Sequence, residues 1–184
     1  MDKQKIPLLH QQLKAFFRSC EKETSFMVDC ELKDRIRFIY KVIFPGIKKF
    51  SFYFRFLLSR FAFYIDYSPL KVFIYRLLGV KIGKGVFISP DVYIDVHFPK
   101  LIRIDDYAIL GHGISIFTHE FLSKKYKLGR VSIGKGAVVG AFSIIASGVN
   151  IGEQANITVR STILKDVPAF HKSGMDNNTN PVNE

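Results

Sequence analysis

The chain has 184 residues, 48% of them hydrophobic, which suffices for one packed domain and an appendage. Its net charge of +11 is uneven: residues 1–80 carry 15 Lys and Arg against 7 Asp and Glu, and the remainder carries 12 against 9. Because the excess belongs to one half, the overall charge does not indicate a nucleic-acid-binding protein, and no nucleic acid is expected as a partner.

Residues 1–34 are polar and mixed in charge, with short apolar groups that predict one or two surface helices. The first twelve residues lack the apolar core of a secretory signal peptide, so we expect a cytoplasmic protein. In that compartment the two cysteines, Cys20 and Cys30, are expected to be reduced thiols rather than a disulfide.

Residues 35–80 hold 14 of the 26 aromatic residues, interleaved with nine Lys and Arg and a single acid, Asp66. Breaks at Pro45-Gly46 and Ser68-Pro69 predict separate helices, the last from about Leu70 to Gly79. No apolar run is long enough to span a membrane. Two compatible hypotheses follow. The segment caps the open end of the next domain, or it makes peripheral contact with the inner face of a membrane through aromatic and basic side chains.

A six-residue period governs the chain from Val80 to about Ala169. Each block opens with Ile, Leu or Val, as in IGKGAV from Ile133 and VGAFSI from Val139. Helices and half-buried strands have other periods, whereas a solenoid of short strands and tight turns has this one. The pattern therefore predicts a mostly β solenoid preceded by an α-helical segment.

Two insertions interrupt the period, one around residues 98–103 and a longer one within residues 120–132. Insertions in a solenoid form loops. The second is basic, and we expect it to project as an arm that can reach a neighbouring subunit. Without the insertions, blocks three apart stack on one another. The expected stacks are Ile82, Ile104 and Ile133; Ile88, Leu110 and Val139; and Ile94, Ile116 and Ile145.

The stacking brings two histidines together. His97 and His119 are both fourth in their blocks, so they should lie one coil apart on the same edge, with roughly 5 Å between backbones. The longer loop leaves directly after His119. Two imidazoles at the base of a loop form a candidate chemical site.

At this point the chain resembles the hexapeptide-repeat acyltransferases, and Phe117-Thr118-His119-Glu120 resembles the Thr-His segment of the sugar-acetylating branch. The resemblance implies a left-handed parallel β-helix with three hexapeptides per coil over residues 81–169, although parallel crossovers are usually right-handed. It also implies an acetyl-CoA-dependent O-acetyltransferase that modifies a saccharide acceptor, in cell-surface polysaccharide or its lipid-linked precursor. The expected assembly is a homotrimer with active sites between subunits. An amino-sugar acceptor stays open.

Acetyl transfer to a hydroxyl needs a base, for which neutral imidazole suits pH 7, and a donor at the developing oxyanion. By the resemblance, His119 is the base and the Ala141 N–H is the oxyanion donor. Glu120 or Asp95 would orient His119 and stabilise its cation. The residues expected to bind the acceptor are Asp95, His97 and Thr118.

The resemblance also places the coenzyme, acetyl-CoA. Pantetheine would lie along the turns at Gly140-Ala141 and Thr158-Val159, and the adenosine phosphates near LKDVP from Leu164, with Arg160 and Lys165 as partners. Two features depart from the family pattern. Val159 and Arg160 stand where small residues are usual, and the Gly-Asn-Pro-Ala-Lys tail is replaced by Ser173-Gly174-Met175-Asp176.

The departures above support an alternative, a weak or inactive trimeric scaffold tethered to a membrane or a glycosyltransferase. Metal chemistry of the carbonic-anhydrase type needs three converging histidines, but His112 belongs to a block on another face, so no metal is expected.

Residues 170–184 are polar and predicted to form a disordered tail.

Overall fold

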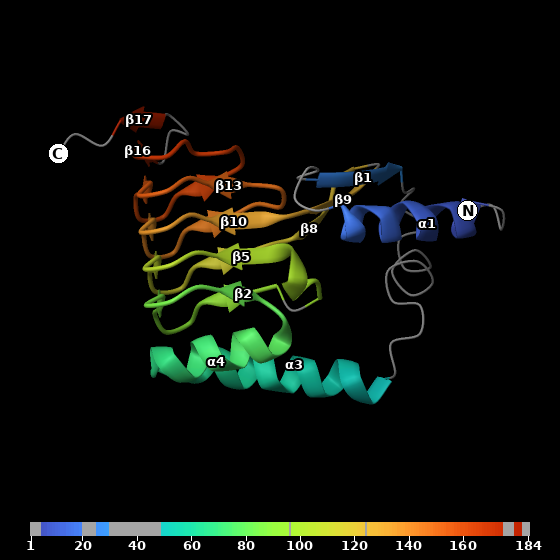
Figure 1. Ribbon diagram of the computed structural model, residues 1–184, viewed down its shortest axis with the longest axis horizontal. Coiled ribbons are helices and arrows are strands. Elements are labelled where there is room, and N and C mark those ends of the chain that lie inside the picture. Colours follow the sequence, from blue (N-terminus) through green and yellow to red (C-terminus); the bar gives the residue numbers. More distant parts are fainter. Residues whose placement is uncertain are drawn as a thin grey trace.

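The computed structural model describes residues 5–19, 25–29, 49–95, 97–123, 125–174 and 179–181. Both cysteines and the predicted break at Pro45-Gly46 lie outside these residues. Short parallel strands stack in three columns and form a solenoid, with helices beneath it and a small lobe beside it (Figure 1).

The strands of the solenoid follow one another around three columns. The first column contains β2 (Lys81–Ile82), β5 (Ile102–Ile104), β10 (Val131–Ile133) and β13 (Asn150–Ile151). The second contains β3 (Phe87–Ile88), β6 (Ile109–Leu110), β11 (Val138–Val139), β14 (Asn156–Ile157) and β16 (His171–Ser173). The third contains β4 (Tyr93–Ile94), β7 (Ser115–Ile116), β12 (Ile144–Ile145) and β15 (Thr162–Ile163).

The observed register confirms the predicted stacking. Ile82 pairs with Ile104, which pairs with Ile133, and the other two predicted stacks pair in the same way. The opening residue of a block points inward, so Leu110 is 0% exposed, whereas its neighbour Ile109 is 43% exposed. The period of six therefore arises because each short strand contributes one inward aliphatic residue before the chain turns a corner.

Many of the corner turns need one residue in the left-handed region. Glycine occupies this position at Gly85 (φ 64°) and Gly113 (φ 66°). Phe142 (φ 59°) and Arg160 (φ 54°) occupy it in later coils. Such a conformation strains a residue that carries a Cβ. Arg160, which departs from the family pattern, therefore adopts the same kind of corner as its counterpart Phe142.

Two helices cover the first coil. They are α3 (Lys49–Tyr64) and α4 (Ser68–Leu78), which begins and ends within two residues of the predicted helix. Pro69 lies in the first turn of α4, where its missing N–H costs no helical hydrogen bond, and Gly79 ends the helix at φ 106°. The inner face of α4 shares one core with the first coil, as the capping hypothesis expects. The α4 residues in that core are Val72, Ile74, Tyr75 and Leu78.

Polar contacts fasten α4 to the turn after β3. The Tyr75 hydroxyl donates to the carbonyl of Val92 at 3.0 Å, and the Lys71 ammonium donates to the carbonyl of Ser89 at 2.6 Å. Burial lowers the pKa of Lys71, while Asp91 and Asp66 act in the opposite direction. A buried ammonium needs such a partner, so α4 is held in one position.

The longer insertion forms a hairpin, β8 (His119–Phe121) and β9 (Lys125–Gly129). Strand β1 (Ser25–Asp29) pairs antiparallel with β9, and helix α1 (Lys5–Arg18) packs against it (Figure 1). The first insertion contains a 3-10 helix, η3 (Pro99–Leu101). These segments, which together we call the N-terminal lobe, share a second core of Phe16, Phe98, Leu101, Tyr126 and Leu128. The predicted projecting arm is therefore covered in part by the chain's own N-terminal segments.

Arg130 joins this lobe to the solenoid. Its guanidinium donates to the carbonyls of Phe16 (2.5 Å) and Ser19 (2.8 Å) at the end of α1, and lies 4.7 Å from the Phe16 ring centroid. The last carbonyls of a helix lack helical partners and attract a cation. Arg130 lies between β9 and β10, and from there it caps the end of α1.

The described residues of the C-terminal segment, 170–174 and 179–181, differ from the predicted disordered tail, and the rest of that segment lies outside the described residues. Residues His171–Ser173 form β16, which pairs in parallel with β14, and β17 (Thr179–Pro181) pairs antiparallel with β16. The physical reason is that β14 offers free backbone groups at the top of the second column. A polar segment can occupy such an edge because the ladder uses its backbone and not its side chains.

The inward register makes a testable prediction. Leu110→Ala should lower the free energy of unfolding by about 2–5 kcal/mol, since it leaves a cavity in the core. Ile109→Ala, one residue earlier and outward, should cost less than about 1 kcal/mol. Denaturant unfolding of both variants measures the difference, and equal losses would contradict the register.

Candidate active site

The site begins with a buried carboxylate. Asp95 follows the inward residue that ends β4, and its side chain is 0% exposed. One oxygen, Oδ2, accepts hydrogen bonds from the backbone N–H (3.1 Å) and the hydroxyl (2.5 Å) of Thr118. The other, Oδ1, accepts from the backbone N–H of His97 at 3.0 Å. The carboxylate therefore joins the first coil to the second.

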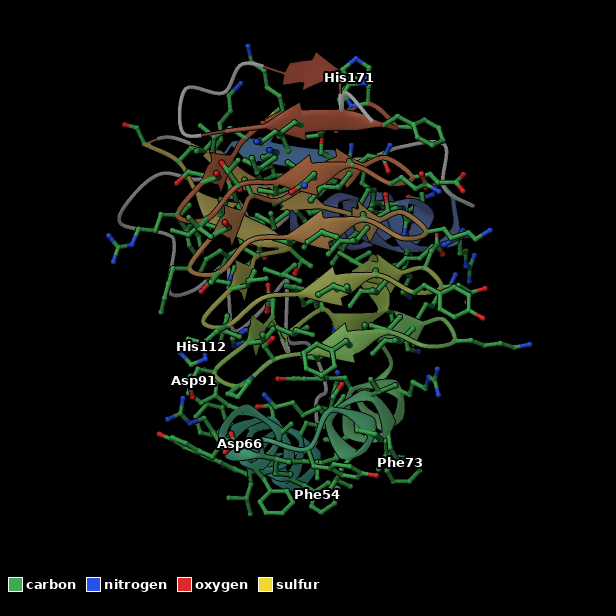
Figure 2. The ribbon with its side chains drawn as sticks, turned by 90° about the vertical axis from the view of Figure 1, so that its left-hand side faces the viewer. Phe54, Asp66, Phe73, Asp91, His112 and His171 are labelled. Atoms are coloured by element: carbon green, nitrogen blue, oxygen red, sulfur yellow. The ribbon has the colours of Figure 1, made fainter. Side chains whose placement is uncertain are left out.

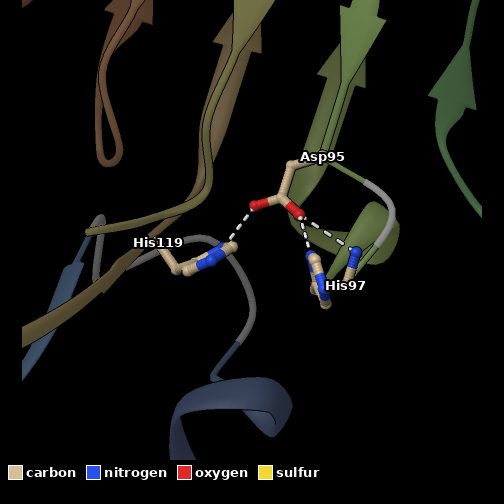
Figure 3. Close-up of side chains that lie close together, drawn as sticks. All are labelled: Asp95, His97 and His119. Carbon is tan, nitrogen blue, oxygen red and sulfur yellow. Dashed lines mark hydrogen bonds and ion pairs between the residues drawn. The ribbon is translucent and has the colours of Figure 1, made fainter. Parts of the chain in front are cut away.

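The same carboxylate binds both histidines. Nδ1 of His119 lies 2.6 Å from Oδ2, and Nδ1 of His97 lies 3.1 Å from Oδ1 (Figure 3). The ring centroids are 5.2 Å apart. The two imidazoles thus lie on neighbouring coils at the same edge, where the stacking predicts them.

Hydrogen bonding keeps Asp95 ionised. Burial alone would raise the pKa of this carboxyl, but hydrogen bonds from His119, His97 and Thr118 outweigh burial and hold its pKa below the usual range. An ionised carboxylate only accepts, so Nδ1 of each ring must carry the proton. In a neutral His119, Nε2 is then the basic nitrogen.

Aromatic side chains pack around His119. The ring of Phe98 lies 5.8 Å from it and that of Tyr126 lies 6.1 Å away, centroid to centroid. Burial, and secondarily Asp95, raises the pKa of the Tyr126 hydroxyl, which stays neutral. Phe17 of α1 lies 6.1 Å from Phe98, so the N-terminal lobe reaches the wall of the site. No local sequence pattern predicts this contact, because Phe17 and Phe98 lie far apart in the chain.

Glu120 and Thr118 make contacts that differ from the predicted ones. The Glu120 carboxylate accepts from the backbone N–H of Ser147 at 2.6 Å, so it fastens the hairpin to the next coil and does not orient His119. Thr118 is buried and hydrogen-bonded to Asp95. Neither Thr118 nor Asp95 is exposed to an acceptor. Of the three residues expected to bind acceptor, only His97, with a side chain 30% exposed, is accessible.

The residues expected to bind coenzyme line another corner. Gly140-Ala141 follows β11 and Thr158-Val159 follows β14, and the two turns stack: the Gly140 N–H donates to the carbonyl of Ile157, and the Arg160 N–H to that of Ala141, both at 2.8 Å. Val159 is 56% exposed. Within the described residues the Ala141 N–H donates to no acceptor. We call residues 140–142 and 158–160 the corner strip.

The corner strip and His119 lie at different corners of one chain. The strip connects the second column to the third, whereas Asp95 and His119 follow the third column. Lys165 follows β15 and so lies on the His119 corner, two coils further along, roughly 10 Å by strand spacing. A single chain therefore does not bring His119 to Ala141.

The third histidine stays apart. His112 lies 3.5 Å from Asp91, and the two residues are neighbours in Figure 2. The ring centroid of His112 is 5.2 Å from that of Phe142, which belongs to the corner strip. Three converging histidines are thus not present among the described residues. The one group of potential metal ligands found there is Asp95, His97 and His119, whose ligand atoms lie within 4.8 Å of one another.

The carboxylate's role can be tested by pH. Asp95→Asn should lower the free energy of unfolding at pH 7 by about 1.5–3 kcal/mol, because it weakens charged hydrogen bonds. Folding lowers the pKa of the Asp95 carboxyl below its value of about 3.9 in the unfolded chain. The carboxylate therefore stabilises the fold fully above that pH, and this stabilisation is lost as the pH falls towards the pKa in the folded protein. The gap between wild type and variant should narrow below about pH 4, measured by denaturant unfolding.

A matched control is Asp105→Asn. Asp105 accepts from Arg103 at 2.7 Å in an exposed pair, and its loss should cost less than about 1 kcal/mol. A gap for Asp95→Asn that stays constant down to pH 2.5 would show that the carboxylate is not held ionised as described.

Curated proteins similar to this chain are acetyltransferases by name. It is 33% identical over 114 residues to "Putative acetyltransferase YvoF" of Bacillus subtilis (strain 168), covering 61% of this chain and 66% of that protein. It is 33% identical over 113 residues to "Putative acetyltransferase SAS0727" of Staphylococcus aureus (strain MSSA476), covering 61% and 70%. "Putative colanic acid biosynthesis acetyltransferase WcaF" of Escherichia coli (strain K12) is 29% identical over 123 residues, covering 54% and 66%. The chain thus spans about two thirds of the length of these relatives.

Solved structures agree on the fold. The hexapeptide-repeat-containing acetyltransferase VCA0836 of Vibrio cholerae, in its complex with acetyl coenzyme A, has a TM-score of 0.59 at 15% identity, covering 77% of this chain and 93% of that one. A maltose O-acetyltransferase from Clostridium difficile 630 has a TM-score of 0.53 at 18% identity, covering 72% and 86%. These likenesses confirm the predicted left-handed β-helix. No protein-family model matches the chain. The six-residue repeat, the three-column fold and the similarity to these relatives show together that the chain belongs to the hexapeptide-repeat acetyltransferases.

Proposed function

We propose that the protein is an acetyl-CoA-dependent O-acetyltransferase that acetylates a sugar hydroxyl in cell-surface polysaccharide or its lipid-linked precursor. The observation that carries this proposal is the buried Asp95 carboxylate bonded to His119, 2.6 Å apart, at the base of the hairpin. Three of the similar proteins support the substrate classes: a structure solved with acetyl coenzyme A, a maltose O-acetyltransferase and a protein named as a putative colanic acid biosynthesis acetyltransferase.

His119 acts as the general base in this proposal. Its Nδ1–H donates to Asp95, so Nε2 can take the proton of the acceptor hydroxyl while the hydroxyl oxygen attacks the thioester carbonyl. The proton then passes to the departing thiolate of coenzyme A, which leaves as the free thiol. The side chain of His119 is 24% exposed, so an acceptor can reach it. Acetyl-CoA supplies the activated acyl group.

Asp95 is a positioning residue and not an acceptor-binding one. It is fully buried, it fixes the tautomer of His119, and its negative charge stabilises the imidazolium that forms during transfer. His97, which is partly exposed on the same carboxylate, is the better candidate to bind an acceptor hydroxyl. In this proposal His119 transfers the proton and His97 binds the acceptor, and the Asp95 carboxylate holds both rings.

The oxyanion donor comes from another subunit in this proposal. The corner strip, with the Ala141 N–H at its turn, lies at a different corner from His119 in the same chain. A ring of three chains would bring the strip of one subunit opposite His119 of the next, since a head-to-tail contact closes in this way. We therefore propose a homotrimer with acetyl-CoA bound between subunits, where Arg160 and Lys165 would approach the phosphates from opposite walls.

The base can be tested directly. His119→Ala should lower kcat for acetyl transfer at least about a hundredfold, because it removes the group that takes the hydroxyl proton. Steady-state assays with acetyl-CoA and a saccharide acceptor measure this. The matched control is Glu120→Gln, the adjacent residue, which should change kcat less than about fivefold, because its carboxylate lies on Ser147. Unchanged turnover in His119→Ala would remove it from the role.

The scaffold alternative depends on the corner strip. Val159 and Arg160 are bulkier than the family's usual residues, which would narrow a pantetheine groove. Both are exposed, and Arg160 adopts the same turn as Phe142 (φ 54° and 59°), so the backbone of the strip is regular. This regularity favours the enzyme over the scaffold.

Titration calorimetry with acetyl-CoA distinguishes the enzyme from the scaffold. The enzyme should bind one acetyl-CoA per chain, and Arg160→Ala should weaken binding by about three- to tenfold through loss of a phosphate partner. His119→Ala should bind as the wild type does. Absence of saturable binding by the wild type at millimolar acetyl-CoA would favour the scaffold.

A further inference from the structure

The helices beneath the solenoid expose large apolar side chains on their outer faces. The set comprises Tyr53, Phe54, Phe56, Leu57, Phe61, Tyr64, Phe73 and Leu77, each at least half exposed. Phe54 and Phe73 lie at the bottom of the molecule, beyond α3 and α4 (Figure 2). The outer face of a surface helix in water is normally polar. We call this set the aromatic base.

Positive charge accompanies the aromatic base. Residues 49–84 contain seven Lys and Arg and one acid, Asp66, and one of the seven, Lys71, is buried against the first coil. Arg60 donates to the Tyr64 hydroxyl at 2.8 Å and lies 5.3 Å from the Phe63 centroid. Arg76 donates to the carbonyls of Ile82 (3.0 Å) and Gly83 (2.5 Å), so it lies where α4 meets the first coil. The base is thus apolar with cations among and beside the aromatic side chains.

The two helices present these side chains in one direction. Both lie across the direction in which the coils stack, under the first coil (Figure 1). The inner face of α4 is already used by the solenoid core, so its outer residues Phe73 and Leu77 point away from the protein. No helix in the described part of the chain is long and apolar enough to cross a bilayer. The geometry fits helices that lie in the plane of a surface.

We propose that the aromatic base docks the protein on an anionic lipid membrane. Aromatic rings and leucines enter the boundary between headgroups and acyl chains, and Lys and Arg attract anionic headgroups. The charge selects this occupant over a second copy of the chain, because two such bases would bring their cations together. In the proposed homotrimer, a threefold axis along the solenoid would point all three bases the same way, so they would bind one membrane together.

The docked orientation places Asp95 and His119 on the side of the solenoid that faces the membrane. Asp95 belongs to the first coil and His119 to the second, and each coil adds about 4.8 Å. The site therefore lies in the two coils next to the helical layer, and that layer, which is one helix or about 10–12 Å thick, separates it from the lipid. A saccharide on a lipid carrier can span this distance. This last step rests on the proposed function, whereas membrane docking does not.

Vesicle flotation of the full chain tests the docking. At about 0.15 M salt, the wild type should float with vesicles that contain about 30 mol% phosphatidylserine and should not bind vesicles made of phosphatidylcholine alone. The variant carrying Phe54→Ser, Phe61→Ser, Phe73→Ser and Leu77→Ser should bind at least about tenfold more weakly. These side chains are exposed, so its thermal unfolding should match the wild type, and a circular dichroism melt checks this.

The matched control is Phe170→Asn, which removes an equally exposed aromatic residue (53%) from the last coil. Its binding should equal that of the wild type. Wild type that does not bind anionic vesicles, or a fourfold variant that binds as well as wild type, would overturn the proposal. So would a fourfold variant whose sedimentation shows loss of an oligomer that wild type forms, since the base would then be a protein interface.

Failure of docking and failure of the proposed activity are distinguishable. His119→Ala should float as the wild type does. The fourfold variant should acetylate a soluble saccharide at the wild-type rate and lose activity on a vesicle-borne acceptor only. If the fourfold variant is equally active on both acceptors, docking does not deliver a lipid-borne saccharide to the site, and that part of the proposal is contradicted.

Discussion

The site depends on one buried anion. Asp95 receives hydrogen bonds from Thr118 and from the backbone of His97, and binds both imidazoles, so its two oxygens are fully used. A buried carboxylate is stable only with such partners. Their positions come from two successive coils, which means that the solenoid must be formed before the anion is satisfied. The fold and the chemistry are linked at this residue.

The solenoid and the N-terminal lobe approach the site from opposite sides. Inward aliphatic residues such as Ile94 and Ile116 fix the coils that carry Asp95 and His119. Phe98 and Tyr126 fill the other side and belong to the core formed with α1 and β1. Arg130 joins that lobe to the solenoid at the end of α1. The environment of His119 therefore depends on residues more than a hundred positions apart.

The sequence predicts the part of this arrangement that repeats. Because every block opens with an inward aliphatic residue, the register of the columns follows from counting, and so does the meeting of His97 and His119. Contacts that occur once could not be counted in this way. Strand β1 has as its partner β9, about a hundred residues on, and no local pattern identifies it. Glu120 stands next to His119 in sequence, but strand alternation turns its carboxylate to Ser147.

The sequence also predicts the helices α3 and α4 better than it predicts what each of their faces contacts. The aromatic residues of 35–80 are compatible with a cap and with a membrane surface, and helix α4 illustrates why one sequence fits both hypotheses. Val72 and Tyr75 belong to the core, while Phe73, between them, is 62% exposed. A helix with apolar residues on opposite faces has a low contrast between its faces, so the pattern alone cannot separate the side that packs on the protein from the side that does not.

The central claim is that His119 of one chain acts with the corner strip of another, and mixed oligomers test it most directly. One variant carries His119→Ala. The other carries Val159→Trp, which fills the strip at an exposed position. Each should be inactive alone. If sites form between subunits, equal amounts unfolded and refolded together should recover about a quarter of wild-type activity, since about one site in four then has both intact halves. If the mixture stays inactive while both variants assemble with each other, each site lies within a single chain, and the account is contradicted.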